Sequence, residues 1–224
     1  MQNQEDKRRE KAFKSMLMFG IFSIVMLFAG LTSAYIVSKG ALSSEQKWDF
    51  ISLPNVFTYS TLAILLSSIF AIFSLRNLKK SKLKSTKHFL ILALLLGIVF
   101  SFLQLQGWSE LVSEGHFFAG KDSNVAASFI YVLTGVHLGH LFAGLIVFAI
   151  LLYKLRINKY SSTNHLGFKL GTWFWHFLGI LWIYLYGFLL YSTNSSDPKN
   201  DSNSITNYSV ESQYSYSSSK YLNY

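Results

Sequence analysis

The sequence predicts an all-α integral membrane protein whose five transmembrane helices form one bundle. Five long segments are apolar and almost free of charged residues, and each reaches roughly the 18 residues that a helix needs to cross a hydrocarbon core of about 30 Å. Lysine and arginine also concentrate in every second gap between these segments, as they do beside the cytoplasmic ends of membrane helices. The predicted spans are residues 16–38, 54–75, 88–106, 126–153 and 169–191.

The distribution of positive charge predicts the orientation of these spans. Fifteen of the 20 lysine and arginine residues precede the first span or lie around the gaps after the second and fourth spans. The positive-inside rule then places the N-terminus in the cytoplasm, and an odd number of spans places the C-terminus outside. We therefore divide the chain into a basic cytoplasmic N-terminus (1–15), a transmembrane domain (16–191) and an outer Ser/Asn/Tyr-rich tail (192–224), which we expect to be disordered.

Composition excludes several classes of protein. The chain has 224 residues, of which 51% are hydrophobic, and a net charge of +9. In a membrane protein such charge orients helices and attracts anionic lipid, so we expect no nucleic-acid partner. The absence of cysteine excludes disulfides, thiolate-bound copper, iron–sulfur clusters and cysteine-ligated zinc.

Small residues in the fourth predicted span have the spacing of a helix-packing motif. Gly135, Gly139 and Ala143 recur every four residues, which brings them to one face of the helix. We therefore predict a close crossing of this helix with a neighbour. Replacing Gly139 with leucine is expected to block that crossing.

The predicted spans contain no carboxylate, but three histidines lie well inside them. This lack of acids argues against a proton pump or a proton-coupled carrier. His137 and His140 share one face of the fourth helix, and His176 lies in the fifth. One interpretation is that these imidazoles bind a metal or haem. We favour the other, in which they hydrogen-bond the fourth and fifth helices together, because no acidic side chain is present to orient a ligating imidazole.

Hydroxyl and amide groups on the second and third spans suggest further helix contacts. Ser67 and Ser68 continue a hydroxyl stripe from Ser60 and Thr61, and Gln104 lies near the end of the third span. Such groups more often join membrane helices than line a transport path. The residues by themselves therefore predict a structural or lipid-binding subunit of a larger assembly, without a complete catalytic constellation.

Five segments in the correct order resemble subunit III of haem–copper oxidases. The Gly-x-His-x-x-His element at 135–140 and the Trp-His-Phe element at 175–177, followed by Trp182, are similar to signatures of its last two helices. Residues 25–35, 53–55 with 65–68, and 104–108 resemble its three earlier helices. The resemblance covers residues 16–191 and corresponds to the five-helix bacterial form.

The resemblance implies a non-catalytic subunit of cytochrome c oxidase in the bacterial plasma membrane. The complex reduces O2 to water and translocates protons, with haem and copper in subunits I and II and no cofactor on this chain. The chain would pack against subunit I, hold phospholipids in a cleft and support proton uptake. The implied structural or lipid-cleft residues are His137, His140, His176, Trp175, Trp182, Gly135, Gly139, Ser67, Ser68 and Gln104.

Two positions depart from the family pattern, and several alternatives stay open. Ile24 and Gly179 stand where many members carry a glutamate and an aspartate, so a role of those carboxylates in proton buffering is in doubt. The tail is either disordered or orders against cytochrome c or another respiratory complex. Subunit III of a quinol oxidase and a homologue associated with nitric oxide reductase are close alternatives. An independent membrane haem protein and a small transporter are remote ones.

Overall fold

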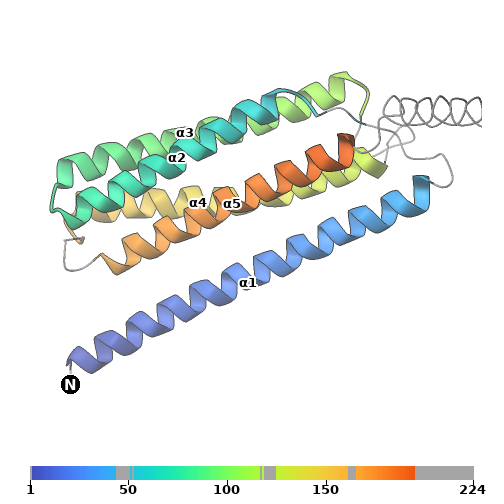
Figure 1. Cartoon of the computed structure of the whole chain (residues 1–224). Coiled ribbons are helices and arrows are strands. Elements are labelled where there is room, and N and C mark those ends of the chain that lie inside the picture. The colour runs from blue at the N-terminus through green and yellow to red at the C-terminus, as the bar shows by residue number, and fades with distance from the viewer. Residues whose placement is uncertain are drawn as a thin grey trace, which may run out of the picture.

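The computed structural model describes residues 2–43, 51, 53–116, 118, 125–160 and 165–194, and within these residues all regular structure is α-helical. Five helices follow one another along the chain (Figure 1). Each contains a segment long and apolar enough to cross a membrane, which confirms the predicted fold class. The helices are α1 (Gln2–Ser43), α2 (Val56–Lys79), α3 (Leu83–Ser113), α4 (Val125–Arg156) and α5 (Leu166–Asn194).

The helices extend beyond the predicted spans at both ends of the bundle. Helix α3 continues to Ser113, seven residues past its predicted end, because Leu111 still faces the core and is fully buried. Helix α5 continues to Asn194, so the first three residues of the predicted tail are helical, and Ser192 is buried. The remainder of the predicted tail lies outside the described residues.

Helices α2 to α5 form a four-helix core, and α1 lies outside it against α4 and α5 (Figure 1). The α2–α3 pair is the closest, since a turn of three residues joins the two helices. Among the described side chains of α1, those of Phe28, Thr32 and Tyr35 are the buried ones, and all three belong to its C-terminal half. Helix α1 is therefore attached to the core along one narrow stripe.

Basic side chains gather at one end of the bundle, which we call the basic end. Helices α1, α3 and α5 begin there, and α2 and α4 end there (Figure 1). The last turn of α2 carries Arg76 and Lys79, and that of α4 carries Lys154 and Arg156. Alternate connections of the antiparallel bundle thus bring the charge clusters of the sequence to the same end.

Candidate functional site

The centre of the four-helix core is built around Trp175 of α5, which is fully buried. Its indole Nε1 donates a hydrogen bond to Ser67 Oγ of α2 at 3.1 Å, and Ser67 Oγ donates to the Ala93 carbonyl of α3 at 2.7 Å. The indole also stacks on Phe148 of α4, with 4.5 Å between ring centroids. One side chain thereby contacts all the other helices of the core.

Two glycines make room for this indole. A Cβ on Gly97 of α3 would lie 2.6 Å from the Trp175 ring, and one on Gly144 of α4 would lie 3.1 Å from it. Sequence reasoning missed both residues. A signal existed, because Gly97 is the one glycine in the third predicted span and a glycine inside a helix costs about 1 kcal/mol relative to alanine, which suggests a packing reason.

No described residue of this chain makes the close crossing predicted at Gly139. A Cβ on Gly139 would meet nothing within 4 Å among the described residues, and the position is exposed. A Cβ on Gly135 would lie 3.6 Å from the Trp108 ring, which is an ordinary van der Waals distance. Glycine spacing identifies one face of a helix but not which neighbour covers that face, and in α4 the crowded face carries Gly144 instead.

Trp182 makes a second set of contacts between helices, about two turns beyond Trp175 on α5 and further from the basic end. Its Nε1 donates to Thr61 Oγ1 at 2.9 Å, and its ring packs edge-on against Phe100 with centroids 5.1 Å apart. Gln104 Nε2 donates to Ser60 Oγ at 2.8 Å across the α2–α3 contact. The predicted hydroxyl stripe therefore joins α2 to its neighbours through Ser60, Thr61 and Ser67.

The three intramembrane histidines do not form the predicted hydrogen bonds between α4 and α5. His137 is fully buried among Phe28, Phe100 and Trp182, and neither of its ring nitrogens has a hydrogen-bond partner within the described part of the chain. His140 Nδ1 instead pairs with the Val136 carbonyl of its own helix at 2.8 Å, the local contact that a four-residue separation favours.

His176 is half-buried and also makes no hydrogen bond with any described residue. Within the described ranges, no three histidine or acidic side chains come close enough together to hold a metal ion. The structure therefore brings His137 into the aromatic core beside Trp182, whereas His176 lies at the edge of the core.

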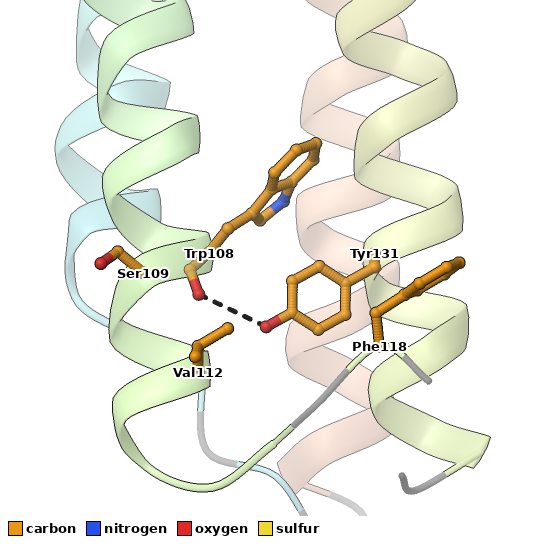
Figure 2. Close-up of a pocket in the computed structure, with 5 residues that line it drawn as sticks. All are labelled: Trp108, Ser109, Val112, Phe118 and Tyr131. Carbon is orange, nitrogen blue, oxygen red and sulfur yellow. Dashed lines mark hydrogen bonds between the residues drawn. The ribbon is translucent and has the colours of Figure 1, made fainter. Parts of the chain in front are cut away.

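An apolar pocket of about 510 Å³ lies between α3 and α4, near the end opposite the basic end (Figure 2). Trp108 and Tyr131 line it with their rings. Their polar atoms are occupied elsewhere, since Trp108 Nε1 donates to Thr134 Oγ1 at 3.0 Å and the Tyr131 hydroxyl donates to the Trp108 carbonyl at 3.3 Å. The pocket therefore offers an apolar aromatic surface with little capacity for hydrogen bonding.

A basic pocket of about 420 Å³ lies at the basic end, between the start of α1 and the α4–α5 connection. Lys154 and Lys159 supply positive charge, and Phe13 of α1 supplies an apolar wall. Burial raises the pKa of Tyr160, so its hydroxyl stays protonated near neutral pH and remains a hydrogen-bond donor. Two ammonium groups and a phenol beside apolar side chains suit an amphiphile with an anionic head.

Comparison with known proteins identifies the family. Residues 2–194, which include all five helices, match the family described as cytochrome c oxidase subunit III. The chain belongs to this family. It is 26% identical to cytochrome bo(3) ubiquinol oxidase subunit 3 of Buchnera aphidicola over 193 residues, which are 84% of this chain and 92% of that protein.

Two cytochrome c oxidase subunits are similar over a shorter stretch. The chain is 25% identical to subunit 3 of Corynebacterium diphtheriae over 166 residues, covering 72% of this chain and 79% of the relative. It is 28% identical to subunit 3 of a Bacillus species over 168 residues, covering 72% and 76%. The resemblance found in the sequence is thus confirmed, and as a subunit III of haem–copper oxidases the chain has other oxidase subunits as partners.

The structure also places the two residues at which this subunit III departs from the family pattern. Ile24 is half-buried and packs against the core, one helical turn before Phe28. Gly179 is buried against α2, where its Cβ would lie 3.1 Å from Ser68 Oγ. Both positions therefore serve packing between helices, which requires no carboxylate.

Proposed function

We propose that this chain is the non-catalytic subunit III of a bacterial cytochrome c oxidase, which reduces O2 to water and translocates protons. The observation that carries the proposal is the family match over residues 2–194, the whole five-helix bundle. The buried polar groups of the core agree with a structural role, because Ser60, Ser67 and Gln104 hydrogen-bond neighbouring helices. Stabilisation of subunit I would be the principal contribution of the chain.

In this proposal the basic end faces the cytoplasm of a plasma membrane, and the C-terminus lies outside. The support is the charge distribution, because lysine and arginine concentrate on the cytoplasmic side of membrane proteins. Haem and copper would reside in subunits I and II, with no cofactor on this chain. Support for proton uptake would be indirect, since none of the five predicted spans contains a carboxylate that could relay a proton.

Purification of the tagged chain from native membranes in mild detergent tests this function. We expect haem absorption and the larger oxidase subunits to be recovered with the chain, and both to be lost together when those subunits are stripped away. Haem that stays on the isolated chain would contradict the proposal and favour an independent haem protein. Recovery of neither haem nor other oxidase subunits would also contradict it.

The basic pocket supports the proposal that this subunit retains phospholipid. Basic pockets between transmembrane helices at the cytoplasmic face bind anionic lipid heads. The pocket places Lys154 and Lys159 next to the apolar side chains of Phe13 and Leu170, which could contact the acyl chains of the same lipid.

Replacing both Lys154 and Lys159 with alanine is expected to remove at least half of the anionic phospholipid that copurifies with the complex, since about 1 kcal/mol is lost with each lysine near the membrane surface. Mass spectrometry of lipid extracted from equal amounts of complex measures the loss. Lys80 and Lys82 provide the matched control, because both are exposed at the basic end away from the pocket. An equal loss from the control pair would contradict a specific site.

The electron donor is a separate part of the proposal. We propose cytochrome c, in line with the family description and with two of the three relatives named above. A quinol donor is the alternative, favoured by similarity to a ubiquinol oxidase subunit over 84% of this chain. Oxygen consumption by the purified complex with reduced cytochrome c, and separately with a quinol, distinguishes the two.

A further inference from the structure

We propose that the outer face of the α2–α5 contact is a docking site for a transmembrane helix of another oxidase subunit, and that His176 hydrogen-bonds that helix. The inference rests on the proposed function, which gives this chain partner subunits in the membrane. It adds which surface meets a partner and what chemistry the partner helix must supply.

Ser68 and His176 both lie deep within the membrane-spanning part of the bundle. Ser68 lies about 17 Å from either end of α2, and His176 lies about 15 Å along α5 from Leu166. Both therefore fall within the part of the bundle that a hydrocarbon core of about 30 Å would surround. Lipid chains at that depth offer no hydrogen bond to a polar side chain.

The two side chains lie on one continuous face. Gly179 is one of the places where the two helices approach closely, since its Cβ would be 3.1 Å from Ser68 Oγ. His176 precedes Gly179 by three residues, so it lies one turn nearer the basic end on that side of α5. The α2–α5 face defined in this way consists of Leu65, Ser68, Ile72, His176, Ile180 and Ile183.

The apolar members show that this face is open to the surroundings of the chain. Leu65 and Ile72 of α2 are 40% and 39% exposed, and Ile180 and Ile183 of α5 are 65% and 44% exposed. Their spacing of three, four or seven residues aligns them with Ser68 and His176 along the two helices. The face is therefore an apolar surface that carries two polar groups near its middle.

Both polar groups lack a partner within the described part of the chain. Ser68 and His176 are half-buried, and neither makes a hydrogen bond with a described residue. By contrast, Ser67 and Trp175, the residues that directly precede them, bond each other at 3.1 Å. Among the described residues, His137 stays unpaired where aromatic rings enclose it, but His176 lies at the edge of the core, where lipid or a neighbouring chain must meet it. Because ionisable side chains inside a membrane rarely face lipid, we assign the contact of His176 to a helix of another chain.

The chemistry of the imidazole defines the partner. A neutral histidine has one N–H donor and one acceptor nitrogen, so a hydroxyl or amide on the facing helix satisfies it. Hydrogen bonds between membrane helices have measured strengths of about 0.6–1.7 kcal/mol, which corresponds to roughly a three- to twenty-fold change in association. A helix of another oxidase subunit that carries such a group near its midpoint is the occupant we propose.

Photocrosslinking in the assembled complex identifies the occupant. The photoreactive residue p-benzoylphenylalanine replaces Ile183 in the α2–α5 face, and in a control chain it replaces Phe102, which is 68% exposed on α3. We expect the Ile183 position to crosslink to a membrane helix of an oxidase subunit and the Phe102 position not to do so. Crosslinks from Ile183 to lipid alone, or to a second copy of this chain, would overturn the inference.

Substitution of His176 tests the hydrogen bond itself. His176→Leu is expected to reduce the fraction of chain that copurifies with haem by roughly three- to twenty-fold, whereas His176→Gln, which keeps a donor and an acceptor, is expected to restore most of it. Thermal unfolding of each isolated chain shows whether the variant still folds as the wild type does. An unchanged yield with His176→Leu would overturn the proposed bond.

The wild-type chain separates this inference from the function on which it rests. If it copurifies with oxidase subunits but the Ile183 and His176 results are negative, the docking face is wrong and the proposed function stands. If the wild-type chain recovers no oxidase subunit at all, both fail.

Discussion

Replacing Trp175 with alanine is expected to lower the free energy of unfolding of the bundle by about 3–5 kcal/mol. The substitution empties the space between Gly97 and Gly144, removes the stacking on Phe148 and leaves Ser67 Oγ without its indole donor. Because that space is bordered by three other helices, the bundle cannot close it by moving one side chain. Denaturant-induced unfolding in detergent micelles, followed by the remaining tryptophan fluorescence, measures the effect.

Trp173 provides the matched control for this prediction. It lies on the same helix but is 48% exposed, and its described contact is with Lys169 at 4.9 Å. Trp173→Ala is expected to change stability by less than about 1 kcal/mol. Trp175→Phe keeps an aromatic ring and removes the N–H group, so its effect should fall between the two. Similar losses from Trp173→Ala and Trp175→Ala would refute the central position of Trp175.

Replacing Gly97 with leucine is expected to destabilise the bundle by about 3 kcal/mol, at the upper end of the usual cost of overpacking. Even the first added carbon would lie 2.6 Å from the Trp175 ring and 2.9 Å from Leu145, and the rest of the side chain has no space. The yield of monodisperse chain in size-exclusion chromatography and its unfolding midpoint report the loss.

Gly139→Leu is the matched control for Gly97→Leu. Nothing in the described residues lies within 4 Å of a Cβ at Gly139, and leucine is a better helix former than glycine. We therefore expect no destabilisation of the isolated chain and a gain in stability of up to about 1 kcal/mol. The two variants add the same side chain to glycines inside neighbouring helices. Equal destabilisation by both would show that loss of glycine itself, and not contact with Trp175, is the cause.

The family match and the number of helices could be predicted from the sequence because both depend on local patterns. Long apolar segments with few charges are consistent with the spans of α1 to α5 in the structure. Motifs such as Trp-His-Phe at 175–177 are read along the chain without any knowledge of which helices touch. The ends of the helices were less predictable, because the hydropathy of Gly107–Ser113 falls although Leu111 is still buried in the core.

Which residues hold the bundle together was decided by the tertiary structure. The sequence does not distinguish Gly97, Gly139 and Gly144, since all three lie in apolar segments. In the structure Gly97 and Gly144 border the Trp175 ring, whereas no described residue lies within 4 Å of a Cβ at Gly139. His137 and His176 likewise share a residue type, yet the first is enclosed by aromatic rings and the second lies at the edge of the core.

The physical reason is that the sequence specifies which residues share a face of a helix but not how that helix is rotated about its own axis. Helical periodicity determines which residues share a face, and hydropathy together with charge determines which segments cross the membrane and in which direction they are expected to do so. Neither determines how each helix rotates toward its neighbours, because in lipid that rotation follows from close van der Waals contact and hydrogen bonds between particular side chains. The sequence by itself therefore determined the family and the five-helix plan, whereas the packing of Trp175 against Gly97 and the outward position of His176 follow from the assembled bundle.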